Sequence, residues 1–248
     1  DLGAIYLDSY GWEKPCWFAK PGIREKYSFK RSNAFTYVQK ECENVQNNIG
    51  ILDLSTFAKY EISGDGSEAF LNRLCANTIP KKEESIILTH MLNEKGRIQS
   101  ELTITRLPNN LFYVLSSTAS EIRDLDWFNH HLNKDEKIKI KNITQDYGVL
   151  VIVGPKSRTT LSQLTSENLN NNNFPWLKGK EILINKIPVR ALRINYMGEL
   201  GWELHHPIKY MESLYDTICE VGKKENIINF GTYAVNSMRM EKAYRGWG

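Results

Sequence analysis

Apolar and polar residues alternate most clearly over residues 86–92 and 98–107. The turn Asn93-Glu-Lys-Gly96 separates these two runs, and a short turn that closes on glycine is typical of a β-hairpin. One face of the second run is apolar except for one serine: Ile98, Ser100, Leu102 and Ile104. The opposite face is polar: Glu101, Thr103 and Thr105. The pattern predicts an antiparallel hairpin that carries Glu101 on its polar face.

Apolar residues at helical spacing predict helices elsewhere in the chain, and runs of β-branched and aromatic residues predict further strands. The predicted helices cover residues 36–47, 67–75, 118–132, 156–164, 208–221 and 232–243. The predicted strands cover residues 59–62, 111–115, 137–143, 148–153, 182–184, 189–196 and 202–205. Strand, helix, strand and strand follow in that order, and the order recurs from about residue 148. It predicts an α+β fold of duplicated, ferredoxin-like strand-helix-strand units with antiparallel sheets.

The helix predicted over residues 118–132 has recognisable start and end signals. Thr118-x-x-Glu121 has the spacing of a capping box, and the apolar spacing then indicates a buried side: Ile122, Leu125 and Phe128 or Leu132. His130 and His131 close the segment, where histidine favours the helix dipole. Adjacent residues of a helix cannot face one metal ion, so this pair is interpreted as structural and no metal site is expected.

The first 50 residues are rich in aromatic residues and largely irregular. They contain Tyr10-Gly-Trp12 and Pro15-Cys-Trp-Phe18. A segment of this kind usually wraps over a surface that other parts of the chain have formed. We therefore divide the chain into an N-terminal wrapping segment and two subdomains: residues 1–50, 51–147 and 148–248.

Composition is that of an ordinary globular protein, because 41% of the 248 residues are hydrophobic and 25% are charged. The net charge of +3 permits an anionic small ligand, and no Lys/Arg run indicates a nucleic-acid partner. No apolar run is long enough to cross a bilayer. The four cysteines lie far apart without a C-x-x-C pair, which argues against a zinc site or a disulfide framework and suits a reducing compartment. The chain has neither an initial methionine nor a signal sequence, so we expect a processed or excised N-terminus.

Residues 193–204 carry the pattern that most strongly suggests a binding site. Strand-like residues lead into the turn Gly198-Glu-Leu-Gly201, and the run Trp202-Glu-Leu204 follows it. Glycine permits a positive φ or a close approach of backbone to a ligand. The turn would hold Tyr196, Glu199 and Glu203 on one rigid corner, where a carboxylate can accept two hydrogen bonds from a planar heterocycle with adjacent N–H donors. An ordinary hairpin with solvent-facing glutamates fits the same spacing.

Six separated stretches, in order over about 200 residues, resemble the folate-binding aminomethyltransferase family. This family includes the glycine-cleavage T-protein and the C-terminal halves of dimethylglycine and sarcosine dehydrogenases. The matching stretches are residues 50–55, 61–66, 93–103, 153–158, 196–204 and 237–245. Residues 10–18 resemble specifically the dehydrogenase branch, in which this segment follows the flavin domain.

The resemblance implies a three-part, clover-like body whose folate lies in a central channel. Carried over by position, Tyr196 and Glu203 contact the pterin with Glu203 as the ring anchor, and Glu199 lies beside them. Glu101 stands where the family has an acidic residue, commonly Asp, beside the reactive folate nitrogens, and here it is one methylene longer. Arg239 stands where the last helix supplies a basic residue to the folate, although an intrahelical pair with a neighbouring acid is an alternative.

The function that the resemblance implies is transfer of a one-carbon unit to tetrahydrofolate, giving 5,10-methylenetetrahydrofolate. The donor would be an N-methyl or aminomethyl compound derived from glycine, dimethylglycine or sarcosine. The alternatives are a folate-binding or assembly module without activity, and a folate-dependent demethylase that shares the fold.

The implied partners are an amine donor and either a lipoyl carrier protein or a fused flavin dehydrogenase domain, with no nucleic acid and no membrane. FAD would be bound only by a separate domain, because no G-x-G-x-x-G is present here. The resemblance also implies a barrel-like C-terminal domain after Trp247, which is absent or truncated in this sequence. The implied location is the bacterial cytoplasm or the mitochondrial matrix.

Overall fold

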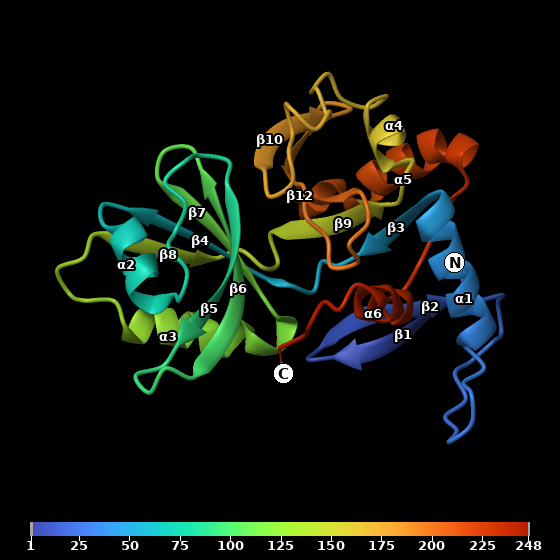
Figure 1. The fold of residues 1–248 in the computed structure, drawn as a ribbon, viewed down its shortest axis with the longest axis horizontal. Coiled ribbons are helices and arrows are strands. Elements are labelled where there is room, and N and C mark those ends of the chain that lie inside the picture. The colour runs from blue at the N-terminus through green and yellow to red at the C-terminus, as the bar shows by residue number, and fades with distance from the viewer. Residues whose placement is uncertain (1, 248) are drawn as a thin grey trace.

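The computed structural model describes residues 2–247 and arranges them around two large sheets and one two-stranded ribbon (Figure 1). The strands are β1 (Ala4–Ser9), β2 (Trp12–Phe18), β3 (Ile49–Asp53), β4 (Ala58–Gly64), β5 (Ile86–Leu92), β6 (Ile98–Leu107), β7 (Leu111–Ser116), β8 (Ile138–Asn142), β9 (Tyr147–Val153), β10 (Gly179–Ile184), β11 (Ile187–Leu192), β12 (Gly201–Pro207) and β13 (Ile227–Asn229). The α-helices are α1 (Phe35–Asn47), α2 (Ser67–Leu74), α3 (Glu121–His130), α4 (Ser157–Leu161), α5 (Met211–Gly222) and α6 (Thr232–Glu241). None of the helices in this described part is long and apolar enough to span a bilayer.

The five-stranded sheet has the order β5-β6-β7-β4-β8, and all its neighbours are antiparallel. Helices α2 and α3 cover one face, where Phe70 and Phe128 pack on Tyr60 and Ile104. The predicted hairpin of residues 86–107 forms β5 and β6, and the charged strand predicted at 137–143 forms the edge strand β8. Period-two alternation therefore located the two strands of this hairpin correctly.

The six-stranded sheet has the order β10-β11-β12-β9-β3-β13, and its neighbours are antiparallel except for the parallel pair β13 and β3. Helices α4 and α5 pack on one face through a core that includes Leu161, Leu214 and Trp202. Helices α1 and α6 pack on the other face at the β3 end. The α+β class with antiparallel sheets was predicted correctly, and β3, in the predicted first subdomain, lies in the same sheet as β9–β12.

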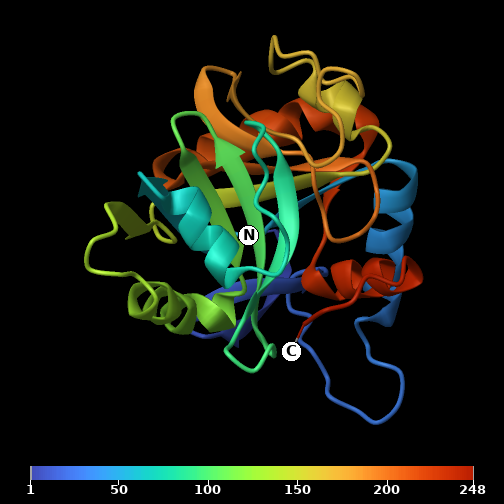
Figure 2. The same cartoon turned by 60° about the vertical axis from the view of Figure 1, so that its left-hand side comes forward.

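The two large sheets meet at the centre of the molecule, as Figures 1 and 2 show from two directions. Tyr113 and Leu115 of β7 share a buried cluster with Leu192 of β11. This contact explains one of two errors in the predicted faces of β6. Thr105, expected on the polar face, is fully buried because the other sheet covers it, whereas Ile98, beyond the irregularity in the β5–β6 register, is 44% exposed.

The start of α3 differs from the predicted capping box. Thr118 donates its hydroxyl to Thr56 Oγ1 at 3.0 Å, and Glu121 accepts from Asn142 Nδ2 at 2.7 Å. Both side chains thus bond to distant parts of the chain, and the helix begins at Glu121 after a 3-10 turn. Ile122, predicted to be buried, is 75% exposed, and Asp124 lies with Phe128 on the buried side. His130 ends the helix, as predicted.

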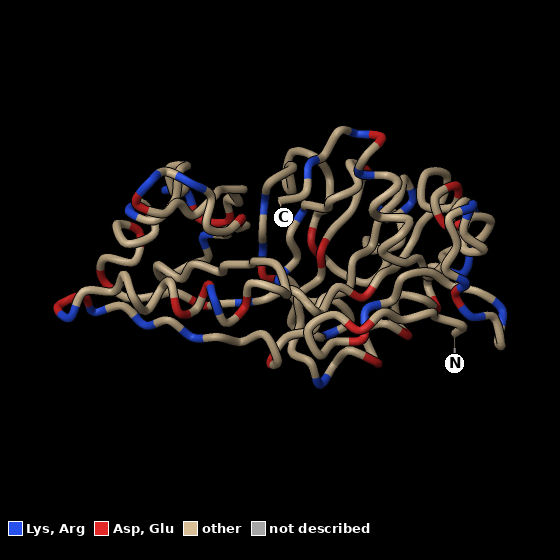
Figure 3. The backbone as a smooth tube through the Cα atoms, turned by 90° about the horizontal axis from the view of Figure 1, so that it is seen from below, with Lys and Arg blue, Asp and Glu red and all other residues tan. Residues whose placement is uncertain are grey.

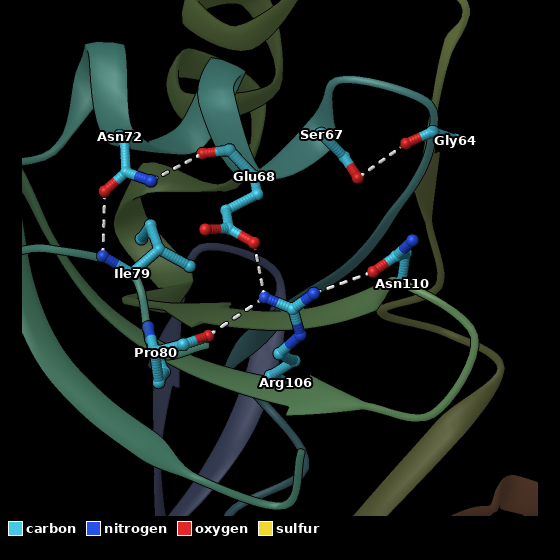
Figure 4. A network of polar contacts seen from close by, with 8 residues as sticks. All are labelled: Gly64, Ser67, Glu68, Asn72, Ile79, Pro80, Arg106 and Asn110. Atoms are coloured by element: carbon cyan, nitrogen blue, oxygen red, sulfur yellow. Dashed lines mark hydrogen bonds and ion pairs between the residues drawn. The ribbon is translucent and has the colours of Figure 1, made fainter. Parts of the chain in front are cut away.

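Helix α2 is tied to the sheet by a polar network around Arg106 of β6 (Figure 4). Its guanidinium donates to Glu68 of α2 at 2.5 Å, to the Pro80 carbonyl at 3.2 Å and to Asn110 at 2.7 Å. A single arginine therefore fixes the helix, the segment that follows it and the β6–β7 turn. Elsewhere, basic and acidic residues are interspersed along the backbone (Figure 3).

The N-terminal segment is more regular than its sequence indicates, because β1 and β2 form an antiparallel ribbon. Trp17 is fully buried against Tyr37 of α1, with ring centroids 5.3 Å apart. The buried carboxylate of Glu41 in α1 accepts hydrogen bonds from the backbone N–H of Phe18 at 2.7 Å and of Gly231 at 2.9 Å. The segment thus packs on the surface that α1 and α6 provide.

Lys59 of β4 is a buried lysine at the joint between the sheets. Its ammonium donates to the carbonyls of Ser55 (2.8 Å), Phe57 (2.8 Å) and Thr144 (3.1 Å), which uses all three of its N–H donors. These carbonyls belong to the β3–β4 and β8–β9 connections, the two places where the chain passes between the sheets. Burial lowers the pKa of Lys59 to about 8.

Replacing Lys59 with methionine should lower the free energy of unfolding by about 3 kcal/mol, because three buried carbonyls lose their donor. Urea denaturation measures this change. The matched control is Lys139→Met on the neighbouring strand β8, where the side chain is exposed and we expect a change within about 0.5 kcal/mol. Equal effects of the two substitutions would contradict the role of Lys59.

Candidate functional site

The corner predicted from the glycine pattern is a loop between two paired strands. Strand β11 ends at Leu192, so the strand predicted as far as residue 196 is wrong at its end. The side chain of Asn195 closes the loop, since it donates to the Glu199 carbonyl at 2.6 Å and accepts from the Met197 N–H at 2.9 Å. These local bonds compete with strand pairing. Gly198 has φ of +72°, the conformation that glycine was expected to supply.

Tyr196 lies on this loop next to two other predicted residues. The guanidinium of Arg239 in α6 is 5.6 Å from the centre of its ring. Burial raises the pKa of Tyr196, Arg239 lowers it, and the nearby charge of Glu101 raises it. The structure therefore places residues of a loop, of the last helix and of strand β6 near one another, and their shared role in binding stays a prediction.

Glu101 projects from β6 opposite His90 of β5. Its Oε2 lies 3.4 Å from His90 Nε2, and its side chain is 30% exposed. The carboxylate is thus held by one neighbour and remains accessible, which suits a group that exchanges protons with a ligand.

Arg239 forms no ion pair with an acidic neighbour in the described part of the helix. It donates to Asn236 Oδ1 and to the Tyr244 carbonyl, each at 2.8 Å. The residues after α6 lie against the site, because the Tyr244 ring is 6.2 Å from Tyr196 and the Trp247 ring is 5.2 Å from the Arg123 guanidinium of α3. Figures 1 and 2 show this tail running from α6 toward the five-stranded sheet.

Glu199 is directed to the same tail and pairs with Lys242 at 3.3 Å. Its side chain is 20% exposed, so the pair fixes the loop to the end of α6. This contact accounts for the Glu199 carboxylate without a ligand.

Glu203 occupies a separate and more buried position on β12, between Leu192 of β11 and Val151 of β9. Its side chain is 14% exposed, and its Oε2 lies 3.2 Å from Nε2 of His205. The other ring nitrogen of His205 lies 2.9 Å from the hydroxyl of Tyr113 in β7. Among residues 2–247, no hydrogen bond or ion pair links Glu203 to Glu101, Tyr196, Glu199 or Arg239.

His205 and Tyr113 were missed by the sequence analysis. One signal was present, because residues 203 and 205 alternate on a strand and therefore share a face. The hydrogen bond between His205 and Tyr113 joins the two sheets, and no local sequence pattern indicates it.

Two cavities of the described chain lie away from these residues. One, of about 400 Å³, is lined by Tyr147, Glu181 and Arg190 among others. The second, of about 430 Å³, lies between α1 and α6 beside Phe35 and Cys42. Neither includes a predicted site residue, so the central folate channel remains a prediction.

The family model of the GCVT N-terminal domain matches residues 1–248. The chain belongs to this family. The aminomethyltransferase resemblance inferred from six short stretches is thereby confirmed.

Relatives in the family differ in their described roles. The chain is 44% identical over 241 residues to the mitochondrial dimethylglycine dehydrogenase of Rattus norvegicus, covering 96% of this chain and 28% of that protein. It is 30% identical over 254 residues to the mitochondrial pyruvate dehydrogenase phosphatase regulatory subunit of Mus musculus, covering 99% of this chain and 29% of that protein. The chain thus spans less than a third of the length of these relatives.

The fold is that of a solved family member. The crystal structure of the glycine cleavage system aminomethyltransferase T from Bartonella henselae superposes with a TM-score of 0.80 at 20% identity, over 99% of this chain and 60% of that one. This likeness shows the fold.

The environment of Glu203 distinguishes it from the other acidic residues of the corner. Burial raises its pKa to about 8. Burial also lowers the pKa of His205 well below the ordinary value, with smaller contributions from Lys59 and Arg190, so the imidazole is neutral. With this pKa the free carboxyl group binds a proton near neutral pH, and N–H donors from a ligand would favour its ionised form.

Replacing Glu203 with glutamine should flatten the pH dependence of stability. The pKa of Glu203 is about 8 in the folded chain against an ordinary value of 4.5, so its contribution to stability is complete below about pH 4.5 and is lost as pH rises through 8. One such proton contributes a slope of about 1.4 kcal/mol per pH unit within that window.

Urea denaturation between pH 5 and 8 measures the slope, which should be shallower in Glu203→Gln than in the wild type. Glu94→Gln, an exposed residue in the β5–β6 turn, is the control and should keep the wild-type slope. Parallel slopes for the wild type and Glu203→Gln would contradict the burial of this carboxylate.

Proposed function

We propose that this domain binds tetrahydrofolate and transfers a one-carbon unit to it from an amine donor, giving 5,10-methylenetetrahydrofolate. The observation that carries the proposal is the Glu203 carboxylate. It is buried, and His205 is its hydrogen-bond partner through Oε2, which leaves Oε1 available to a ligand. Such a carboxylate fits the adjacent N–H donors of a pterin ring, which would be held as the family resemblance implies.

Bound tetrahydrofolate would supply the nucleophilic nitrogens that accept the one-carbon unit. Glu203 would anchor the ring. Tyr196 and Arg239 would contact the remainder of the ligand from the loop and from α6. Holding the ligand and the amine donor together contributes through proximity, potentially several kcal/mol.

Glu101 is the residue we assign to the reacting atoms. Its accessible carboxylate would stabilise the positive charge of the donor carbon and accept a proton released during transfer. The extra methylene relative to the Asp common in the family lengthens its reach, and His90 limits its orientation.

The two carboxylates should respond differently to substitution. Glu203→Gln should weaken tetrahydrofolate binding about tenfold or more, because the amide nitrogen replaces an acceptor. Glu101→Gln should lower turnover by about 10²-fold or more while changing affinity little. Fluorescence titration gives the affinity, and a formaldehyde-trapping assay with and without tetrahydrofolate gives methylene transfer.

Glu94→Gln, in the turn of the same hairpin as Glu101, serves as the control and should match the wild type in both measurements. Equal losses of affinity in Glu101→Gln and Glu203→Gln, with turnover per bound folate unchanged, would refute this division of roles.

A second candidate function is folate binding or assembly without catalysis. The similarity to a relative named as a regulatory subunit favours it, as does the Glu at position 101. Binding of tetrahydrofolate by the wild type without methylene transfer would support this candidate. A demethylase that moves a methyl group to folate would instead require a different donor in the same assay.

The partner we propose is a flavin dehydrogenase, in the same chain or in a complex, that generates the amine donor. The similarity to dimethylglycine dehydrogenase supports it. We propose the mitochondrial matrix as the location if the source is eukaryotic, since several relatives are named as mitochondrial, and the cytoplasm if it is bacterial.

A further inference from the structure

Three hydrogen-bonded side chains cross from one large sheet to the other. Tyr113 belongs to β7 of the five-stranded sheet, and His205 and Glu203 belong to β12 of the six-stranded sheet. The Tyr113 hydroxyl lies 2.9 Å from His205 Nδ1, and His205 Nε2 lies 3.2 Å from Glu203 Oε2. The Tyr113 and His205 rings meet edge to face with centroids 5.3 Å apart. Both sheets therefore contribute side chains to the surroundings of Glu203.

The direction of these hydrogen bonds follows from Tyr113. Its hydroxyl is buried, and among residues 2–247 its hydrogen-bond partner is His205 Nδ1. Burial raises the pKa of Tyr113 far above its usual range, so the hydroxyl keeps its proton, and an unprotonated Nδ1 is the arrangement that gives this proton an acceptor. The imidazole proton then resides on Nε2, which donates to Glu203 Oε2. One tyrosine hydroxyl thereby fixes the tautomer of the histidine.

The fixed tautomer determines what Glu203 presents to a ligand. Burial raises the pKa of Glu203 to about 8, and a donor at Oε2 opposes this effect because it favours the ionised carboxylate. The same donor stops rotation of the group, so Oε1 is held in one orientation. In the opposite tautomer, the Nε2 lone pair would face Oε2 and repel it. The carboxylate would then rotate or bind a proton, and a protonated carboxyl no longer accepts two N–H donors.

The other charged groups near Tyr113, His205 and Glu203 already have partners. Arg190 of β11 lies 4.9 Å from the Tyr113 ring and pairs with Glu61 of β4 at 2.7 Å and with Glu181 of β10 at 3.1 Å. Lys59 of β4 is bound to backbone carbonyls, and Tyr147 of β9 packs on Arg190. His205 is thus the group in hydrogen-bond contact that can orient Glu203.

We propose that His205 and Tyr113 are positioning residues for ligand recognition. They hold Glu203 with one oxygen directed to the site, so that a heterocycle with adjacent N–H donors is bound only where the two sheets are packed together. This inference rests on the proposed function, in which the heterocycle is the pterin of tetrahydrofolate.

Four single variants test the proposal, with tetrahydrofolate as the ligand and methylene transfer as the second measurement. Tyr113→Phe and His205→Ala should each weaken binding about tenfold. His205→Gln should restore part of the loss, because its amide N–H can occupy the place of Nε2–H. His206→Gln is the matched control, since His206 is also buried in β12 but bonds the Leu204 carbonyl of its own strand. Turnover at saturating folate should stay near the wild-type value in all four.

A spectroscopic measurement separates positioning from a general loss of structure. The ¹⁵N chemical shifts of His205 in the wild type should be those of the Nε2–H tautomer, and Tyr113→Phe should lose this signature while its thermal unfolding stays cooperative. In a Glu203→Gln background, Tyr113→Phe should cause no further loss of affinity, because both act through one carboxylate.

The outcomes separate this inference from the proposed function. Absence of tetrahydrofolate binding by the folded wild type would overturn both. Binding that is weakened by Glu203→Gln but unchanged in Tyr113→Phe and His205→Ala would overturn the positioning role alone. An equal loss in His206→Gln and His205→Ala would also overturn it, because the effect would then not depend on contact with Glu203.

Discussion

The structure depends on burying polar and charged groups between two sheets that each present a mixed inner face. The contact includes Tyr113 and Leu192, but it also includes an arginine and a glutamate that pair across the sheets. Charges removed from water are costly unless they are paired and hydrogen-bonded, so an arrangement of the two sheets that pairs Arg190 with Glu61 is favoured over one that separates them. The polar contacts therefore specify how the sheets pack, and the site residues take their positions from that packing.

Much of the fold follows from local patterns in the sequence. Alternation over residues 86–107 and the helical spacing over residues 232–243 correspond to β5, β6 and α6, because periodicity reports which face is buried. The ribbon β1–β2 and the short strand β13 were missed, since their pairing partners rather than their own spacing stabilise them. The capping box at Thr118 failed for a related reason, as distant residues took both of its side chains.

The residues of the candidate site were likewise predicted only in part from the sequence. Tyr196, Arg239 and Glu101 were predicted from a family resemblance, and the structure brings them together. Glu199 pairs with Lys242 at the end of α6, and its predicted contact with a ligand stays a prediction. His205 could have been suspected from its spacing to Glu203, whereas Tyr113 could not, because 92 positions separate it from His205. Sequence patterns identify groups that share a strand, and the packing of sheets identifies the groups that bond across them.

The carboxylate of Glu41 has a consequence for the order in which the chain folds. It receives backbone N–H groups from Phe18 and Gly231, and the ribbon passes so close to Gly231 that a side chain there would overlap the Cys16 carbonyl. The ribbon can therefore reach its final position only after residue 231 has been synthesised and α6 has begun to form. Contacts between residues so far apart form slowly, which makes docking of the first strands a late step in folding. The ribbon, which precedes α1 in the chain, is accordingly among the last of the described elements to reach its final position.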